Sequence, residues 1–146
     1  MTILIAYATK GKATEEYANA IEEVLREKGF EPDVVSLMKG TVNPSKYDTV
    51  IAGFGVRAGK PYREAIEFLK NDFTGKKVAI FVSTLEPSKS AVEKYIRPLS
   101  KNASLKHVSA KVLGGRFKIL WKTIDKTNVE SAKKWAAELI RKKVVS

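Results

Sequence analysis

Short apolar stretches alternate with amphipathic segments along this chain. An apolar run bounded by polar, Gly-containing loops is typical of a strand that is buried on both faces of a parallel sheet. Five such strands are predicted, at residues 3–7, 31–36, 49–54, 77–82 and 107–113. The pattern therefore indicates an α/β protein rather than a helical bundle or a sandwich of sheets.

The segments between and after these strands carry a helical pattern. Helices are predicted at residues 15–28, 61–69, 88–99 and 129–142. Gly29 is placed to cap the first helix, and Pro61 suits the first turn of the second. Parallel strands that are joined by helical crossovers give a three-layer, doubly wound domain with a five-stranded parallel sheet. At 146 residues, the whole chain, 1–146, is expected to be one domain.

The first predicted strand leads directly into a polar loop that contains two threonines, two lysines and a glycine, at residues 9–14. Such a loop lies at the carboxyl edge of a parallel sheet, where open α/β folds bind ligands. The N-terminus of the following helix offers free N–H groups and a positive dipole end to an anion. We interpret the loop as a phosphate site; the alternative is a plain strand-to-helix connection with Thr14 as the N-cap.

Composition excludes several classes of site. The chain has no cysteine, so it has no disulfide, thiolate metal site or cysteine nucleophile, and no other residues have metal-ligand spacing. His107, the only histidine, is expected to have a structural or surface role rather than a catalytic or metal-binding one. No segment is long and apolar enough for a membrane span, which favours a cytoplasmic location. The absence of glutamine, with abundant Lys and Glu, suggests a thermophilic source.

The net charge of +11 is concentrated in the last third of the chain. Residues 1–100 carry a balance of +2, and residues 101–146 carry +9. If residues 114–126 form a helix, Phe117, Leu120, Trp121 and Ile124 share one face beside a stripe of lysines. That surface could bind an anionic membrane weakly; the alternative is that its apolar face packs on the sheet.

Three segments give the chain a resemblance to the flavodoxin-like superfamily, which binds FMN on a parallel sheet of order 2-1-3-4-5. They are Ala8–Thr14, Val50–Gly59 and Phe81–Leu85. The pattern Val56-Arg57-Ala58-Gly59 is similar to that of short flavodoxin-domain proteins related to menaquinone-dependent protoporphyrinogen oxidase. The resemblance implies FMN as cofactor, bound by these residues: Thr9, Lys10, Gly11, Lys12, Ala13, Thr14, Val56, Arg57, Ala58, Gly59, Ser83, Thr84 and Leu85.

The loop departs from the flavodoxin phosphate motif, Ser/Thr-x-Thr-Gly-x-Thr. With Thr9 and Thr14 aligned, Gly11 replaces the middle threonine and Lys12 replaces the glycine. Lysine is strained wherever φ must be positive, so the motif predicts strain at Lys12 if the loop closes in the usual way.

Two functions follow from these observations. The first is an FMN-binding redox protein that passes electrons to an acidic redox protein, or acts on a small oxidisable substrate or quinone. The second is a flavin-free, basic binding module for an acidic protein, a membrane surface or RNA. Nucleic acid is the least expected partner, because the basic residues are not interleaved with stacking aromatics. Arg57 either lies near the flavin or an acidic substrate, or is a solvated loop charge.

Overall fold

A parallel sheet forms the centre of the molecule. The computed structural model describes residues 2–57, 59–85, 89–106, 108–119 and 122–145. Its long strands are β1 (Ile3–Ala8), β2 (Asp33–Ser36), β3 (Thr49–Arg57), β5 (Lys77–Thr84) and β6 (Ser109–Gly114). They lie in the order β2-β1-β3-β5-β6, with every neighbouring pair parallel. The predicted order 2-1-3-4-5 is confirmed, because β5 and β6 are the fourth and fifth long strands of the chain.

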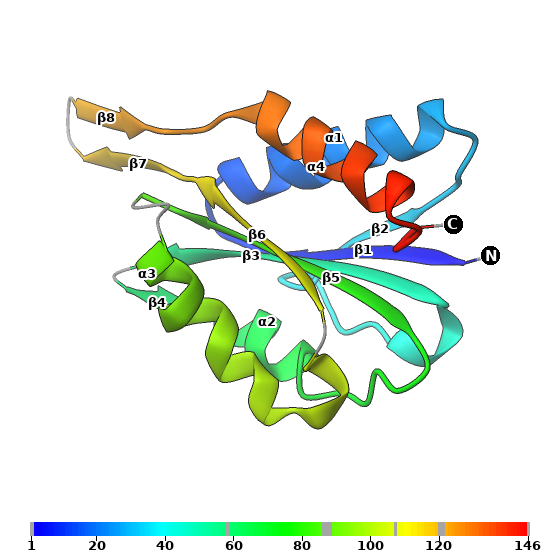
Figure 1. Ribbon diagram of the computed structural model, residues 1–146. Helices are drawn as coiled ribbons and strands as arrows, with labels where there is room; N and C mark the ends of the chain where they lie inside the picture. Colours follow the sequence, from blue (N-terminus) through cyan, green and yellow to red (C-terminus); the bar gives the residue numbers. More distant parts are fainter. Residues whose placement is uncertain (1, 58, 86–88, 107, 120–121, 146) are drawn as a thin grey trace.

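Helices cover both faces of this sheet (Figure 1). One face carries α1 (Ala13–Glu27) and α4 (Val129–Arg141), and the other carries α2 (Arg63–Phe68) and α3 (Lys89–Ala91). Short 3-10 turns occur at Pro44–Lys46 and Ala103–Leu105. The predicted three-layer arrangement is therefore confirmed.

Alternate residues of β1 enter two separate cores. Ile3 and Ile5 pack on the face that α1 and α4 cover, whereas Leu4 and Ala6 pack beneath α2. Successive side chains of a strand point to opposite faces, so a strand that is buried on both sides needs an unbroken apolar run. This periodicity is the physical reason why the first strand could be predicted from the sequence.

The helix α1 ends in the glycine cap that the sequence predicted. Gly29 has a φ of +90°, and its N–H donates to the Arg26 carbonyl at 3.0 Å. The Phe30 N–H donates to the Leu25 carbonyl at 2.9 Å, so the chain leaves the helix through a glycine in the left-handed region. The predicted cap is confirmed. The helix itself begins at Ala13, two residues earlier than expected.

Two predicted helices differ from the observed ones. Pro61 lies in β4 (Lys60–Pro61), which pairs with the end of β3 in an antiparallel way, so α2 begins only at Arg63. The helix predicted over 88–99 is present from Lys89 in the described residues, but its geometry is mixed: α3 passes into a π-helix at Val92–Ile96 and a 3-10 helix at Arg97–Lys101. Pro98 has no N–H to donate to the carbonyl four residues earlier, which favours another helical geometry there.

The segment after β6 forms a hairpin instead of a helix. Strands β7 (Arg116–Ile119) and β8 (Lys122–Asp125) pair in an antiparallel way and project beyond the carboxyl edge of the sheet (Figure 1). Polar and apolar residues alternate within β7, which fits a strand as well as a helix. The helical interpretation of residues 114–126 is therefore wrong, and Leu120 and Trp121 lie outside the described residues.

Candidate functional site

A cavity of about 540 Å³ opens at the carboxyl edge of the sheet. Four segments that are distant in sequence surround it, one at the carboxyl end of each of β1, β3, β5 and β6. Its lining residues are Thr9, Lys10, Gly11, Lys12, Ala13, Thr14, Gly55, Val56, Arg57, Tyr62, Ser83, Thr84, Leu85, Gly115 and Arg116. Carboxyl ends of parallel strands meet at one edge, which explains how the three predicted segments come together.

The loop before α1 has a relaxed backbone. Lys12 is the N-cap of α1 with a φ of −103°, so the expected strain at this lysine does not occur. The Gly11 N–H donates to the Thr9 hydroxyl at 3.0 Å, which closes the loop locally. Lys10 and Lys12 are both exposed. The loop is thus compatible with lysine at the position where the flavodoxin motif has glycine.

The first turn of α1 faces the cavity. The first helical hydrogen bond joins the Glu16 N–H to the Lys12 carbonyl at 2.9 Å. The N–H groups of Ala13, Thr14 and Glu15 precede this bond and have no acceptor within the helix. These donors and the positive end of the helix dipole favour an anionic group at this end of the cavity.

A buried pair of hydroxyls joins two of the segments. The Thr14 and Ser83 side-chain oxygens lie 2.6 Å apart, and both residues are buried. Thr14 is therefore not the N-cap, as the alternative interpretation had it, but stands in the first turn with its hydroxyl bound to β5. Only one of the two hydroxyls can donate within the pair, so the other keeps its proton for a ligand.

Gly55 leaves the space that this hydroxyl pair faces. A Cβ on Gly55 would stand 3.1 Å from the Thr14 hydroxyl and 3.2 Å from the Thr9 hydroxyl. Any side chain at this position would crowd both threonines. Gly55 was not among the predicted site residues. Its place directly after the predicted strand 49–54 could have identified it as a residue of the site.

The turn between β3 and β4 forms one side of the mouth. Val56 and Arg57 line the cavity, and the Arg57 side chain is exposed. Gly59 has a φ of +76°, which the tight turn requires, but it does not line the cavity. Ala58 lies outside the described residues.

Tyr62 is a cavity residue that the sequence analysis missed. It is half-buried, stands as the N-cap of α2 and lines the cavity together with the end of β3. An aromatic ring in this place can pack against a flat ligand. Its position depends on the short strand β4. A strand of two residues is too short to show a hydrophobic pattern, so the sequence did not predict it.

Arg116 joins the β7–β8 hairpin to α1. Its guanidinium donates to both Glu16 carboxylate oxygens, at 3.1 and 2.9 Å, and to the Asp125 carboxylate at 3.0 Å. The hydroxyl and N–H of Thr127, together with Arg116, lower the pKa of Asp125 to about 2. The hydrogen bonds to Glu16 and Asp125 raise the pKa of Arg116. This set of contacts, which we call the Arg116 clasp, holds the hairpin beside the cavity.

The Tyr17 hydroxyl binds the backbone on both sides of the hairpin. It donates to the Gly114 carbonyl and accepts a hydrogen bond from the Asn128 N–H at 3.0 Å. Burial raises the pKa of Tyr17. Since Tyr17 is fully buried, it fixes the end of β6 and the start of α4 relative to α1.

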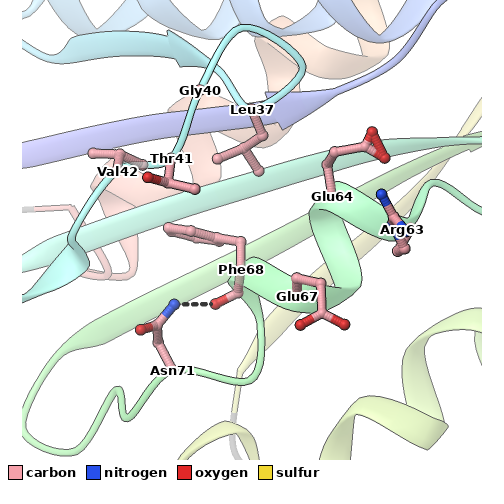
Figure 2. A pocket seen from close by; sticks show the side chains of 9 residues that line it. All are labelled: Leu37, Gly40, Thr41, Val42, Arg63, Glu64, Glu67, Phe68 and Asn71. Atoms are coloured by element: carbon pink, nitrogen blue, oxygen red, sulfur yellow. Dashed lines mark hydrogen bonds between the residues drawn. The ribbon is translucent and has the colours of Figure 1, made fainter.

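A second cavity of about 380 Å³ lies away from these segments, between α2 and the loop after β2 (Figure 2). Leu37, Val42 and Phe68 give it an apolar floor, and the Asn71 amide donates to the Phe68 carbonyl at 2.7 Å. None of the predicted site residues lines it. The only helix that begins beside it among the described residues is the six-residue α2, and no buried hydroxyl pair lines it. Its chemistry therefore differs from that of the first cavity.

Two other observations concern the described residues. They contain no group of three or more His, Cys, Asp or Glu side chains that could hold a metal ion. His107 lies outside them. Within the same part of the chain, no helix has the length and apolarity to cross a membrane.

Comparison with known proteins gives a consistent result. The sequence model of the family described as "Flavodoxin domain" matches residues 4–137. No curated protein sequence matches the chain. Solved structures with the same fold include oxidised Flavodoxin 1 from Bacillus cereus, with 22% identity and a TM-score of 0.70 over 97% of this chain and 98% of that one.

Two further structures extend this comparison. The flavodoxin from Fusobacterium nucleatum bound to flavin mononucleotide is 19% identical, with a TM-score of 0.63 over 97% of this chain and 98% of that one. The rubredoxin oxygen:oxidoreductase from Desulfovibrio gigas is 14% identical, with a TM-score of 0.65 over 99% of this chain and 37% of that one.

Proposed function

The chain belongs to the flavodoxin domain family, and from this premise we propose that it is an electron-transfer protein whose cavity at the carboxyl edge of the sheet binds FMN. One observation carries the proposal. A single cavity joins the first turn of α1, two threonine hydroxyls and the ends of β3 and β5. A phosphate and a flat ring could each find suitable partners in it.

The loop before α1 would hold the phosphate. Thr9 and Thr14 supply hydroxyls, and the first turn of α1 supplies N–H groups. Lys10 and Lys12 add positive charge beside the same loop, which strengthens binding of a dianion. The space at Gly55 keeps the hydroxyls accessible.

The other side of the cavity would hold the flavin ring. Bound FMN supplies the redox chemistry, because its ring can carry one or two electrons. Tyr62 offers an aromatic face to the ring, and the backbone of Ser83–Leu85 offers polar groups at its edge. The Arg57 guanidinium would stabilise the negative charge that reduction adds to the ring.

A finer function also has support. The Val56-Arg57-Ala58-Gly59 pattern suggests a relation to the protoporphyrinogen-oxidase branch, in which a small oxidisable substrate or a quinone would exchange electrons at the same cavity. Arg57 favours this version, because an exposed guanidinium at the mouth could bind an acidic substrate.

One of the two observations that favoured a flavin-free binding module no longer does so. It rested on a lysine at a glycine position and on the basic last third of the chain. Lys12 adopts a φ of −103°, so its backbone needs no glycine. The charge excess alone is equally compatible with a basic redox protein.

The absorption spectrum tests this proposal. FMN is mixed with the purified protein, free FMN is removed by gel filtration, and flavin absorbance is measured in the protein fraction. We expect about one FMN for each chain, and less than about a tenth of that in Gly55→Val, which fills the space at the threonine hydroxyls. Ala137→Val, on the exposed side of α4, is the control. Absence of flavin from the wild-type fraction would contradict the proposal.

A further inference from the structure

Three cations gather at the turn between β3 and β4. Arg57 and Lys60 are direct cross-strand partners in the antiparallel pair. The Lys94 ammonium approaches the same turn, 3.3 Å from the point where a Cβ on Gly59 would stand. All three side chains are exposed. We refer to Arg57, Lys60 and Lys94 as the turn cluster.

No carboxylate neutralises the turn cluster among the residues that the structure describes. Five other cations among the described residues do have acidic partners: Arg26 pairs with Glu22, Lys70 with Glu67, Arg97 with Glu93, Arg116 with Glu16 and Asp125, and Lys133 with Glu23. Even Glu93, which is next to Lys94 in sequence, forms its ion pair with Arg97 at 2.9 Å.

This arrangement works against the stability of the turn. Like charges that lie directly opposite each other on paired strands repel, because their Cβ atoms are only about 5 Å apart. A local arrangement that destabilises the fold is expected where function requires it. An anionic partner would remove the repulsion, so the turn cluster has the properties of a recognition surface.

The cluster also lies at the place where a redox partner must approach. Arg57 belongs both to the turn cluster and to the lining of the 540 Å³ cavity. Electron exchange with a group in that cavity requires a partner at its mouth. The three cations come from two separate elements, β3–β4 and the π-helix after α3, so together they match several carboxylates on a surface better than one small anion.

We propose that the turn cluster is the docking surface for a redox protein that presents a patch of carboxylates. The proposal rests on the proposed electron-transfer function and specifies where its partner binds. It assigns docking to the turn between β3 and β4 rather than to the basic last third of the chain. Opposite charges at this surface would steer the partner to the mouth and fix its orientation there.

Binding of an acidic [2Fe–2S] ferredoxin is the test. Its dissociation constant is measured by interferometry at 20 mM and 300 mM NaCl, with wild type, Lys60→Glu/Lys94→Glu and Lys134→Glu/Lys142→Glu. The two double variants change net charge equally, and Lys134 and Lys142 are exposed at α4, on the opposite face of the sheet. Circular dichroism checks that each variant is folded.

We expect the first double variant to weaken binding at 20 mM NaCl by at least about tenfold, and the α4 variant by less than about threefold. Salt should weaken wild-type binding by about tenfold or more, since exposed charges are screened. Equal weakening by both double variants, or no wild-type binding at 20 mM NaCl, would overturn the proposal. Anionic vesicles are tested with the same variants. If Lys60→Glu/Lys94→Glu weakens binding to the vesicles but not to the ferredoxin, the proposal is also overturned.

The same measurement separates this proposal from the proposed function. Docking depends on surface charge, so it is measured on the protein both with and without added FMN. A protein that takes up no FMN but binds the ferredoxin through the turn cluster would contradict only the proposed function. A protein that takes up FMN but binds the ferredoxin equally in both double variants would contradict only the docking surface.

Discussion

The buried Thr14 hydroxyl connects the loop before α1 to the end of β5. Its 2.6 Å contact with Ser83 makes it both a structural group and, in our proposal, a phosphate ligand. Removing one hydroxyl of a buried pair leaves the other without its partner, which costs about 1–3 kcal/mol of stability.

Thr14→Val is therefore expected to lower the free energy of unfolding by about 1–3 kcal/mol and to raise the dissociation constant for FMN by at least about tenfold. Thr14→Ser keeps the hydroxyl and should retain most of both. Urea unfolding and flavin fluorescence titration measure the two effects. Tight FMN binding by Thr14→Val would exclude this hydroxyl as a ligand.

Arg57 allows a separate prediction about the ring. If its guanidinium stabilises the negative charge that reduction adds, Arg57→Ala should lower the reduction potential of bound FMN. Arg63→Ala removes an equal charge from an exposed residue that does not line this cavity, and should change the potential less. A redox titration compares the two. A potential that Arg57→Ala leaves unchanged would assign Arg57 to the solvent.

For single residues, the sequence predicted which loop lines the cavity after β1, but not the conformation of that loop. Thr9 and Thr14 were placed by their position after a buried strand. The strain expected at Lys12 did not occur, since residue type restricts φ without fixing it, and the loop instead closes through the Thr9 hydroxyl. Tyr62 and Arg116 were missed because β4 and the β7–β8 hairpin position them.

Among the elements, the β7–β8 hairpin depends on contacts that are distant in sequence. Phe117, Leu120, Trp121 and Ile124 follow a helical spacing, but residues 116–119 also alternate between polar and apolar. The Gly115 N–H donates to the Thr84 carbonyl and the Lys126 N–H donates to the Gly115 carbonyl, both at 2.8 Å. These long-range bonds favour strands over a helix, and no local pattern predicts them.

The Arg116 clasp predicts a pH dependence for this hairpin. The pKa of Asp125 is about 2 in the folded protein, below the ordinary value of 3.8, so its ionised form stabilises the fold. This contribution is fully present above pH 3.8 and is lost as the pH falls towards 2. Asp125→Asn should therefore lower the Tm at pH 5, and the difference from wild type should shrink between pH 4 and pH 2.

Glu138→Gln is the matched control for this measurement. Glu138 is exposed on α4, and its side chain forms no ion pair with another described residue. We expect it to have the wild-type dependence of Tm on pH. If Asp125→Asn also follows the wild-type curve from pH 5 to pH 2, the clasp does not contribute to stability in solution.

In the molecule as a whole, the central strands of the sheet pack closely against each other and against α4. A Cβ on Gly53 would lie 2.0 Å from the Phe81 ring, whose centroid is 6.0 Å from that of Trp135 in an edge-on contact. Gly53→Ala should therefore destabilise the protein by about 1–3 kcal/mol through overpacking. Gly11→Ala, whose Cβ would make an ordinary 3.7 Å contact, should change stability by less than about 0.5 kcal/mol. Equal urea midpoints would contradict this packing.

The fold as a whole followed from the sequence more completely than the site did. Apolar runs such as residues 3–7 predicted the strands, and parallel crossovers brought the ends of β1, β3 and β5 to one edge. The first cavity lies at that edge and contains eleven of the thirteen predicted site residues; Ala58 is not described, and Gly59 stands beside the turn. The helix α4 was also predicted, but the β7–β8 hairpin was not, because contacts with β5 and α1 that are distant in sequence determine it.

Calorimetric titration with FMN and with riboflavin distinguishes a phosphate site from a site for the ring alone, because the two ligands differ by the phosphate. We expect FMN to bind at least about a hundredfold more tightly, since the loop before α1 offers N–H groups, hydroxyls and positive charge to the phosphate alone. Equal affinities would contradict a phosphate site at Thr9–Thr14. Binding of neither ligand would contradict the assignment of the cavity to a flavin.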